Sequence, residues 1–207
     1  GWYMKTEAYY KDIYTVQFPD TSIETNVDGK SYGAELLIAK QVQEEGFYGW
    51  LAVSYGKSTR KDRITGTEID YRYNTPISAT LAVNYDFGKG WNLGATLRVQ
   101  SGDAYTPVEN VTLHPDNYFV FEYGESNSLR TPAYHRLDIR LEKQSSYSFG
   151  NITYYLDLLN VYGRDNISDR QYPWYLVSQT ATGGWQANAD ESSNIPFYGA
   201  LGVNIAF

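Results

Sequence analysis

Cysteine is absent from this chain of 207 residues, so disulfide bridges, thiolate nucleophiles and cysteine-based zinc sites are excluded together. Long apolar runs are absent too, since no stretch approaches the roughly eighteen consecutive apolar residues that a membrane-spanning helix needs. Positive charge is scarce: 17 Lys and Arg stand against 24 Asp and Glu, a net charge of −7. The chain therefore lacks the electrostatic footprint of a protein that binds nucleic acid or an anionic lipid surface.

The start of the chain, Gly1-Trp2-Tyr3, shows neither the basic nor the apolar segment of a secretory signal. We therefore expect either a mature product or a fragment. Tyrosine is abundant, with 21 copies, and this residue favours strands and interfaces. We expect a single all-β domain over residues 1–207, with strands at Trp2–Tyr14, Ser31–Gln41, Phe47–Lys57, Thr75–Phe87, Trp91–Ser101, Thr131–Lys143, Phe149–Tyr162 and Pro196–Phe207.

The connections between these strands fall into two length classes. The tight ones are Val42–Gly46, Gly88–Gly90 and Gln144–Ser148. In alternation with them come long polar connections: Thr15–Lys30, Ser58–Asn74, Gly102–Arg130 and Gly163–Ile195. Short turns on one side and long loops on the other are typical of outer-membrane barrels. The pattern predicts a transmembrane antiparallel up-and-down β-barrel of about eight strands, with short periplasmic turns and long extracellular loops.

Within the strands, apolar and polar side chains alternate, which places them on opposite faces of a sheet. In the sixth expected strand, Leu137, Ile139 and Leu141 alternate with charged residues. The polar side chains that we expect to face a lumen are Glu35, Arg98, Arg136, Asp138, Arg140, Glu142 and Asp157. Such a face suits a filled interior of a small closed barrel, and equally a sector of a wide barrel that faces water or a plug.

Aromatic residues gather where the expected strands meet their connections. On the short-turn side these are Phe47, Tyr48, Tyr85, Phe87, Trp91, Tyr147, Phe149 and Phe207. Toward the loops they are Tyr14, Tyr32, Tyr55, Tyr73, Tyr105, Tyr134, Tyr162 and Tyr198. Two such rows predict the aromatic girdles of a barrel that crosses a membrane.

Five segments together resemble the C-terminal barrel strands of TonB-dependent outer-membrane receptors: Gly33–Leu37, Tyr48–Tyr55, Phe87–Gly102, Pro132–Asp138 and Leu156–Tyr162. The end of the chain, with Leu201, Val203, Ile205 and Phe207 at alternate positions, resembles the signal that the outer-membrane assembly machinery recognises. The resemblance implies a location in the outer membrane of a Gram-negative-type envelope, contact with its lipid, and energised uptake of a scarce nutrient such as a metal chelate, vitamin or glycan.

The chain also departs from that family, whose barrels have 22 strands and a plugged lumen. Nothing in these residues resembles the plug domain or the segment that engages TonB, so energy and gating must come from elsewhere. We expect one sector of a larger wall, with the remainder of the receptor barrel and the plug domain as partners. The alternative is a stand-alone small barrel with a structural, adhesive or assembly-substrate role and no transport.

Catalytic and metal-binding patterns are weak, and we expect no enzyme, no metal and no cofactor. His114 and His135 lack a spaced ligand motif, and Ser101, Ser126 and Ser128 lack the partners of a serine hydrolase. Binding is better sought in the loops, where aromatic rings can stack on a ligand. The candidate ligand-binding residues there are Tyr172, Trp174, Tyr175 and Trp185.

Overall fold

The computed structural model describes residues 1–14, 27–41 and 46–207, and most of these residues lie in strands. The long strands are β1 (Trp2–Ile13), β2 (Val27–Lys40), β3 (Gly46–Asp62), β5 (Ile77–Gly88), β6 (Trp91–Gln100), β11 (Tyr134–Tyr147), β12 (Gly150–Leu159) and β17 (Tyr198–Ala206). These match the eight expected strands to within a few residues. The largest extension is in β3, which continues to Asp62 because its end pairs with both β2 and β4 (Glu68–Asp70).

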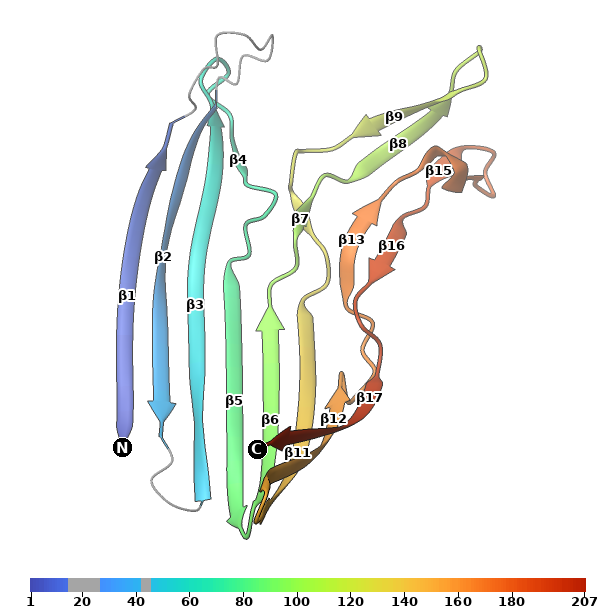
Figure 1. Cartoon of the computed structure of the whole chain (residues 1–207). Coiled ribbons are helices and arrows are strands. Elements are labelled where there is room, and N and C mark those ends of the chain that lie inside the picture. Colours follow the sequence, from blue (N-terminus) through green and yellow to red (C-terminus); the bar gives the residue numbers. More distant parts are fainter. Residues whose placement is uncertain (15–26, 42–45) are drawn as a thin grey trace.

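The long strands form one antiparallel sheet in the order β1-β2-β3-β5-β6-β11-β12-β17, with β4 pairing beside β3. Each strand thus lies next to its predecessor among the long strands, as in an up-and-down meander (Figure 1). The sheet is curved, and its β12–β17 end turns across the front of the view in Figure 1. The all-β, antiparallel part of the expected fold is confirmed.

The sheet is open. Among the described residues, β1 pairs only with β2, and β17 pairs only with β12, so the two edges do not meet. A closed barrel within this chain, one of the two expected forms, is not found there, because closure requires β1 to hydrogen-bond to β17. The described residues also contain no helix that is long and apolar enough to cross a membrane.

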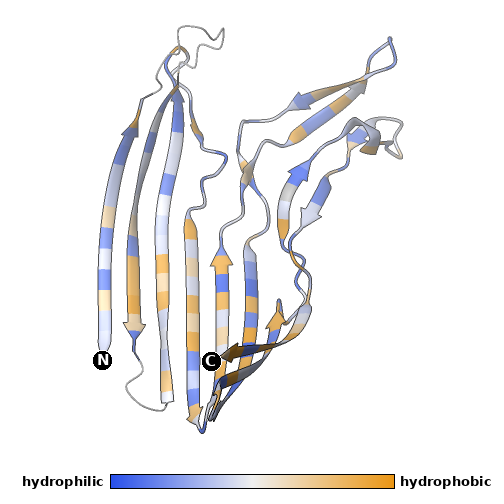
Figure 2. Ribbon diagram, viewed as in Figure 1, coloured by the Kyte–Doolittle hydropathy of each residue, from blue (hydrophilic) through white to orange (hydrophobic). Residues whose placement is uncertain are grey.

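One face of the sheet is apolar across all eight strands. The registers align Leu81, Leu97 and Leu137 in a row, and apolar residues continue above and below it on the same face. Figure 2 shows the resulting alternation of hydrophobic and hydrophilic residues along the strands. No described element covers this face: Leu201 is 83% exposed, and the buried apolar residues, Ala104 and Val111, both belong to the long connections. The sheet therefore has no second layer and no core of its own.

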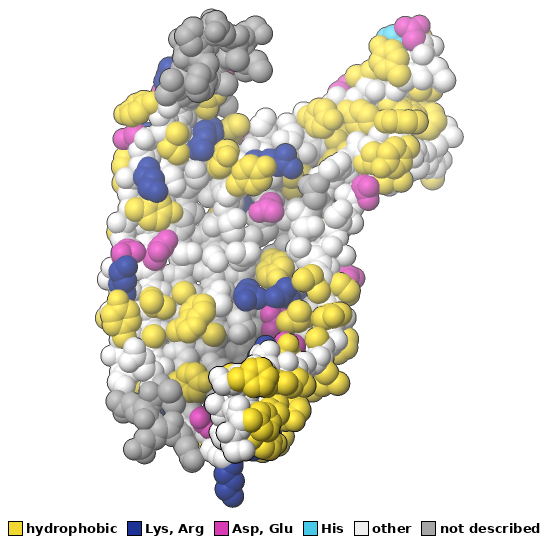
Figure 3. Space-filling model, viewed as in Figure 1, with side chains coloured by type: hydrophobic (Ala, Val, Ile, Leu, Met, Phe, Trp, Pro, Cys, Tyr) yellow, Lys and Arg dark blue, Asp and Glu magenta, His cyan; other side chains and the backbone are white. Residues whose placement is uncertain are grey.

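The opposite face is polar and concave. Figure 3 looks onto this face over β1–β6, where Lys, Arg, Asp and Glu side chains lie, while hydrophobic side chains gather over the β12–β17 end, which turns its outer face to the view. Large rings fit this face above small residues. A Cβ at Gly202 would lie 2.2 Å from the ring of Tyr155, its partner across β12 and β17. A larger residue at position 202 would therefore have to displace the ring of Tyr155.

The short connections lie at one end of the sheet and the long ones at the other (Figure 1). Gly88, Lys89 and Gly90 all adopt positive φ, which makes the tight β5–β6 turn. The β11–β12 turn needs only Ser148 and Phe149, so β11 extends four residues beyond the expected strand end at Lys143. The expected turn Val42–Gly46 lies outside the described residues except for Gly46, and so does most of Thr15–Lys30.

We expected the other long connections to be simple loops. The structure shows instead that they carry secondary structure of their own. They contain β7 (Ala104–Tyr105), β8 (Val108–Leu113), β9 (Phe119–Tyr123), β10 (Leu129–Arg130), β13 (Ile167–Gln171), a 3₁₀ turn η1 (Trp174–Leu176), β14 (Val177–Gln179), β15 (Trp185–Ala187) and β16 (Asp190–Ser193). β14, β15, β8 and β9 form a separate four-stranded sheet. Its strands come from two different connections, which therefore fold together above the main sheet.

Candidate functional site

The seven polar residues that we expected to face a lumen all lie on the polar face of the sheet, by strand register. Asp138 forms a cluster with two others of these seven residues. Its carboxylate accepts hydrogen bonds from Arg98 at 3.1 Å and from Arg136 at 2.8 Å. These side chains belong to β6 and β11, so the ion pairs tie neighbouring strands together across this face.

A second cluster surrounds Arg140. Its guanidinium lies 2.5 Å from Glu142 and 3.0 Å from Asp157, and its carbon lies 4.2 Å from the centre of the Tyr155 ring. Glu35 is not part of either cluster. It lies toward the β1 edge, directly opposite Glu7 in the β1–β2 register.

Two asparagines hold the top of β11 and β12. Asn160 is fully buried, accepts from the Arg164 amide, and donates to the carbonyls of Arg164 and Ile195. Asn166, 1% exposed, exchanges two hydrogen bonds with the His135 backbone. Sequence analysis found the Leu156–Tyr162 segment that contains Asn160, but it missed Asn166, which lies outside any motif.

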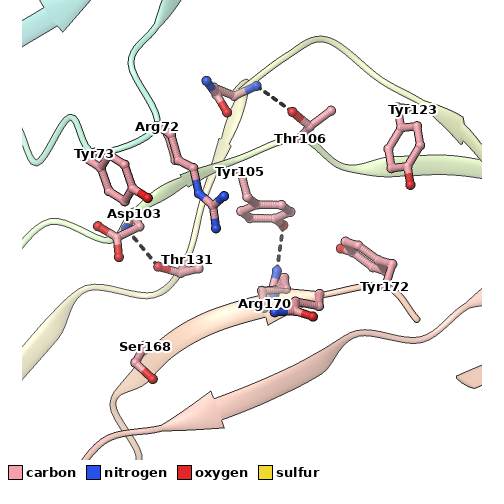
Figure 4. Close-up of a pocket in the computed structure, with 13 residues that line it drawn as sticks. Arg72, Tyr73, Asp103, Tyr105, Thr106, Tyr123, Thr131, Ser168, Arg170 and Tyr172 are labelled. Carbon is pink, nitrogen blue, oxygen red and sulfur yellow. Dashed lines mark hydrogen bonds between the residues drawn. The ribbon is translucent and has the colours of Figure 1, made fainter.

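The long connections enclose a pocket of about 400 Å³ at the end of the sheet away from the tight turns. Its wall is built by side chains from three connections, among them Arg72, Tyr73, Tyr105, Tyr123, Arg170 and Tyr172. Figure 4 shows the Arg72 guanidinium between the rings of Tyr73 and Tyr105, with Tyr123 and Tyr172 on the far side. The lining therefore combines phenol rings and guanidinium groups with smaller polar side chains.

Arg170 is fixed in this wall by contacts on several sides. It donates a hydrogen bond to the Tyr105 hydroxyl at 2.6 Å, pairs with Glu191, and lies with its guanidinium carbon 4.8 Å from the Tyr105 ring centre. Burial raises the pKa of the neighbouring Tyr172 phenol above its ordinary value. Tyr172 is therefore neutral at physiological pH, and the charge of Arg170 is already compensated by a carboxylate.

Arg130 holds the connections beneath the pocket. It donates to the carbonyls of Asn74 at 2.6 Å and Gly102 at 3.1 Å, and its other arm binds the Asp70 carboxylate at 2.7 Å. Asn127 adds a hydrogen bond of 2.8 Å to the Asp70 carbonyl. These hydrogen bonds join residues of two long connections, so they fix the positions of the two connections relative to each other.

Of the four loop aromatics that we singled out, only Tyr172 lines this pocket. Trp174 and Tyr175 contact each other edge to face on the surface, 70% and 62% exposed. Trp185 packs against Phe119 inside the small sheet, with ring centres 5.1 Å apart. The structure therefore does not bring these four rings together at one site, and their stacking on a ligand stays a prediction.

Some of the aromatic residues that we expected in the two girdles also lie elsewhere. Tyr48 lies on the polar face, where Asn92 donates to its hydroxyl at 2.7 Å, and so it is not part of an outer girdle. Tyr73 and Tyr105 line the pocket. Sequence analysis missed these two as pocket residues, together with Arg72 and Arg170, because the pocket exists only once three distant connections meet.

The two histidines are far apart in the fold. His114 lies at the β8–β9 tip, stacked on Tyr118 and 3.4 Å from Asp116, while the ring of His135 contacts the Tyr162 hydroxyl at 2.8 Å. Among the described residues, no group of three or more His, Cys, Asp or Glu side chains is arranged to hold a metal ion.

The end of the chain places Leu201, Val203, Ile205 and Phe207 along the outer face of the β17 edge, all of them exposed. Compared with known proteins, the chain matches no protein-family model, no curated protein and no solved structure.

Proposed function

We propose that this chain is a wall sector of a transmembrane β-barrel in the outer membrane, part of a receptor of the TonB-dependent type that takes up a scarce nutrient. The observation that carries the proposal is the outer face of the main sheet. It is apolar over all eight strands, and none of the described residues covers it.

The energetics of that face favour a lipid environment. Removing one Leu or Ile side chain from water is worth roughly 1.5–3 kcal/mol, and this face carries such residues on every long strand except β1, where Met4 takes their place. Soluble monomers rarely leave contiguous apolar patches larger than a few hundred Å² exposed. Lipid would cover the outer face, while the hydrogen-bonded ladders satisfy the backbone of the wall.

Other features agree with this environment. Exposed rings lie near the tight turns, including Phe87, Trp91 and Tyr147, where the headgroup region of a bilayer favours aromatic side chains. The ion-paired polar face is suited to a lumen, and the larger folded connections would lie outside the cell. The partners would be lipid, the remaining wall and plug, and the assembly machinery; TonB itself would act through a part that these residues do not contain.

The open edges favour a sector over the stand-alone small barrel. Among the described residues, no strand pairs with the outer side of β1 or of β17, and unpaired backbone groups are costly in lipid. Further strands of a larger wall would pair with them. The small closed barrel stays the alternative, and it requires β1 and β17 to pair with each other.

The test uses the absence of native cysteine. Single cysteines at positions 93–99 of β6, introduced into the protein in outer-membrane vesicles, are spin-labelled, and collision with oxygen and with a water-soluble nickel complex is measured. We expect labels at Leu93, Ala95 and Leu97 to meet oxygen and those at Gly94 and Thr96 to meet nickel. Equal nickel access at both sets of positions would refute the membrane wall.

A further inference from the structure

We propose that the pocket between the long connections binds a neutral carbohydrate. The role of this pocket as the recognition site of an uptake receptor rests on the function proposed above, although the binding itself does not depend on transport. The pocket volume of about 400 Å³ falls within the range of roughly 300–1,000 Å³ that is usual for small-molecule sites.

The wall of the pocket suits a ligand ring that has an apolar face and polar groups at its edge. Tyr73, Tyr105, Tyr123 and Tyr172 supply flat apolar faces that end in hydroxyl groups. Tyr73 is 68% exposed and Tyr123 is 61% exposed, on opposite sides of the pocket in Figure 4. The C–H face of a sugar can pack on such rings, while Asp103 and Ser168 offer hydrogen-bond partners to its hydroxyls.

The charges of the site argue against an anionic ligand. Arg170 is paired with Glu191, Arg130 with Asp70, and the pocket wall also contains a carboxylate, Asp103. The chain as a whole carries a net charge of −7, which repels anions at long range. The lining contains two guanidinium groups, Arg72 and Arg170, and they stand against the carboxylate of Asp103 in the wall and that of Glu191, which pairs with Arg170. The site therefore has no excess of positive charge to select an anion, and it favours a ligand with hydrogen-bonding groups and no net charge.

The wall is preformed. The Asp103 amide donates to the Thr131 hydroxyl and the Asn127 amide to the Thr106 hydroxyl, both at 3.0 Å, as drawn in Figure 4. Together with the Arg130 contacts, these hydrogen bonds hold the connections before a ligand arrives. A pocket that needs little ordering loses less affinity to conformational entropy on binding.

The test measures binding to the protein purified in detergent. An array of neutral oligosaccharides, with uronic-acid and sialylated glycans as its anionic members, identifies a ligand, whose dissociation constant is then measured by calorimetry. We expect a neutral glycan to bind, and Tyr73→Ala and Tyr123→Ala each to weaken it roughly tenfold through the lost ring contact. Tyr118→Ala is the matched control, because Tyr118 is 52% exposed but lies outside the pocket.

Three outcomes would overturn the proposal: no neutral glycan binds, binding survives both pocket substitutions, or anionic glycans are preferred with an affinity that falls as salt rises. Because Tyr73 and Tyr123 are largely exposed, their truncation leaves the fold intact and a loss of binding is interpretable. Failure here would leave the spin-label result in membranes unaffected, so the two proposals can fail separately.

Discussion

Replacing Leu97 with arginine tests the outer face at its most sensitive point. Trp91 lies in the aromatic rim near the tight turns, and Leu97 lies six residues further along β6. At about 3.3 Å per residue this is roughly 20 Å of strand, and a strand tilt of about 40° brings it to roughly 15 Å of depth. The apolar band of an outer-membrane barrel is about 25 Å tall, so Leu97 would lie within a few Å of the midplane.

Arginine at the midplane of a barrel wall costs about 2–4 kcal/mol, and we expect Leu97→Arg to lower the free energy of unfolding by that amount. Thr96→Arg is the matched control: the same change, one residue away, on the face that carries Asp138 directly opposite. We expect it to cost under about 1 kcal/mol. Guanidinium unfolding in lipid vesicles, followed by tryptophan fluorescence, measures both, and equal costs at the two positions would refute the assignment of faces.

Three further predictions concern the top, the end and the edges of the sheet. Asn160→Ala removes three side-chain hydrogen bonds from a fully buried site, so guanidinium unfolding should show a loss of roughly 2–4 kcal/mol; a loss below about 1 would contradict the structure. Deletion of Phe207 should slow insertion by reconstituted assembly machinery while detergent refolding is unchanged; unchanged insertion would count against an assembly signal. A short bis-maleimide should join Thr6→Cys to Leu36→Cys, its register partner, but not to Val203→Cys; a Thr6–Val203 cross-link would establish the small closed barrel.

The long strands could be predicted from sequence because each has one apolar face and one polar face. Trp91–Gln100 alternates apolar and polar residues without interruption, and a register slip of one residue would reverse every side chain. The tight turns are equally local, since the positive φ values at Gly88, Lys89 and Gly90 follow from a glycine-rich tripeptide. These elements depend on neighbours in sequence, which the sequence displays directly.

The long connections could not be predicted in the same way. Strand β15 pairs with β8 through Trp185 and Val111, and nothing local in either segment specifies the other. The pocket has the same origin, because Tyr73, Tyr105 and Arg170 come from three different connections. Short strands of two to six residues also carry too little periodicity to be distinguished from polar loop.

The charges on the polar face bear on the choice between the two barrels considered above, the proposed sector of a large barrel and the small closed barrel. Glu35 lies directly opposite Glu7 across β1 and β2, while Lys5 lies 2.5 Å from Glu7. In the packed interior of a small closed barrel, two facing carboxylates would carry a large desolvation cost. In a wide lumen, water or a basic group on a plug would stabilise both carboxylates. The β1 side of the polar face therefore favours a sector of a large barrel, in agreement with the unpaired edges, and against an eight-stranded barrel closed on itself.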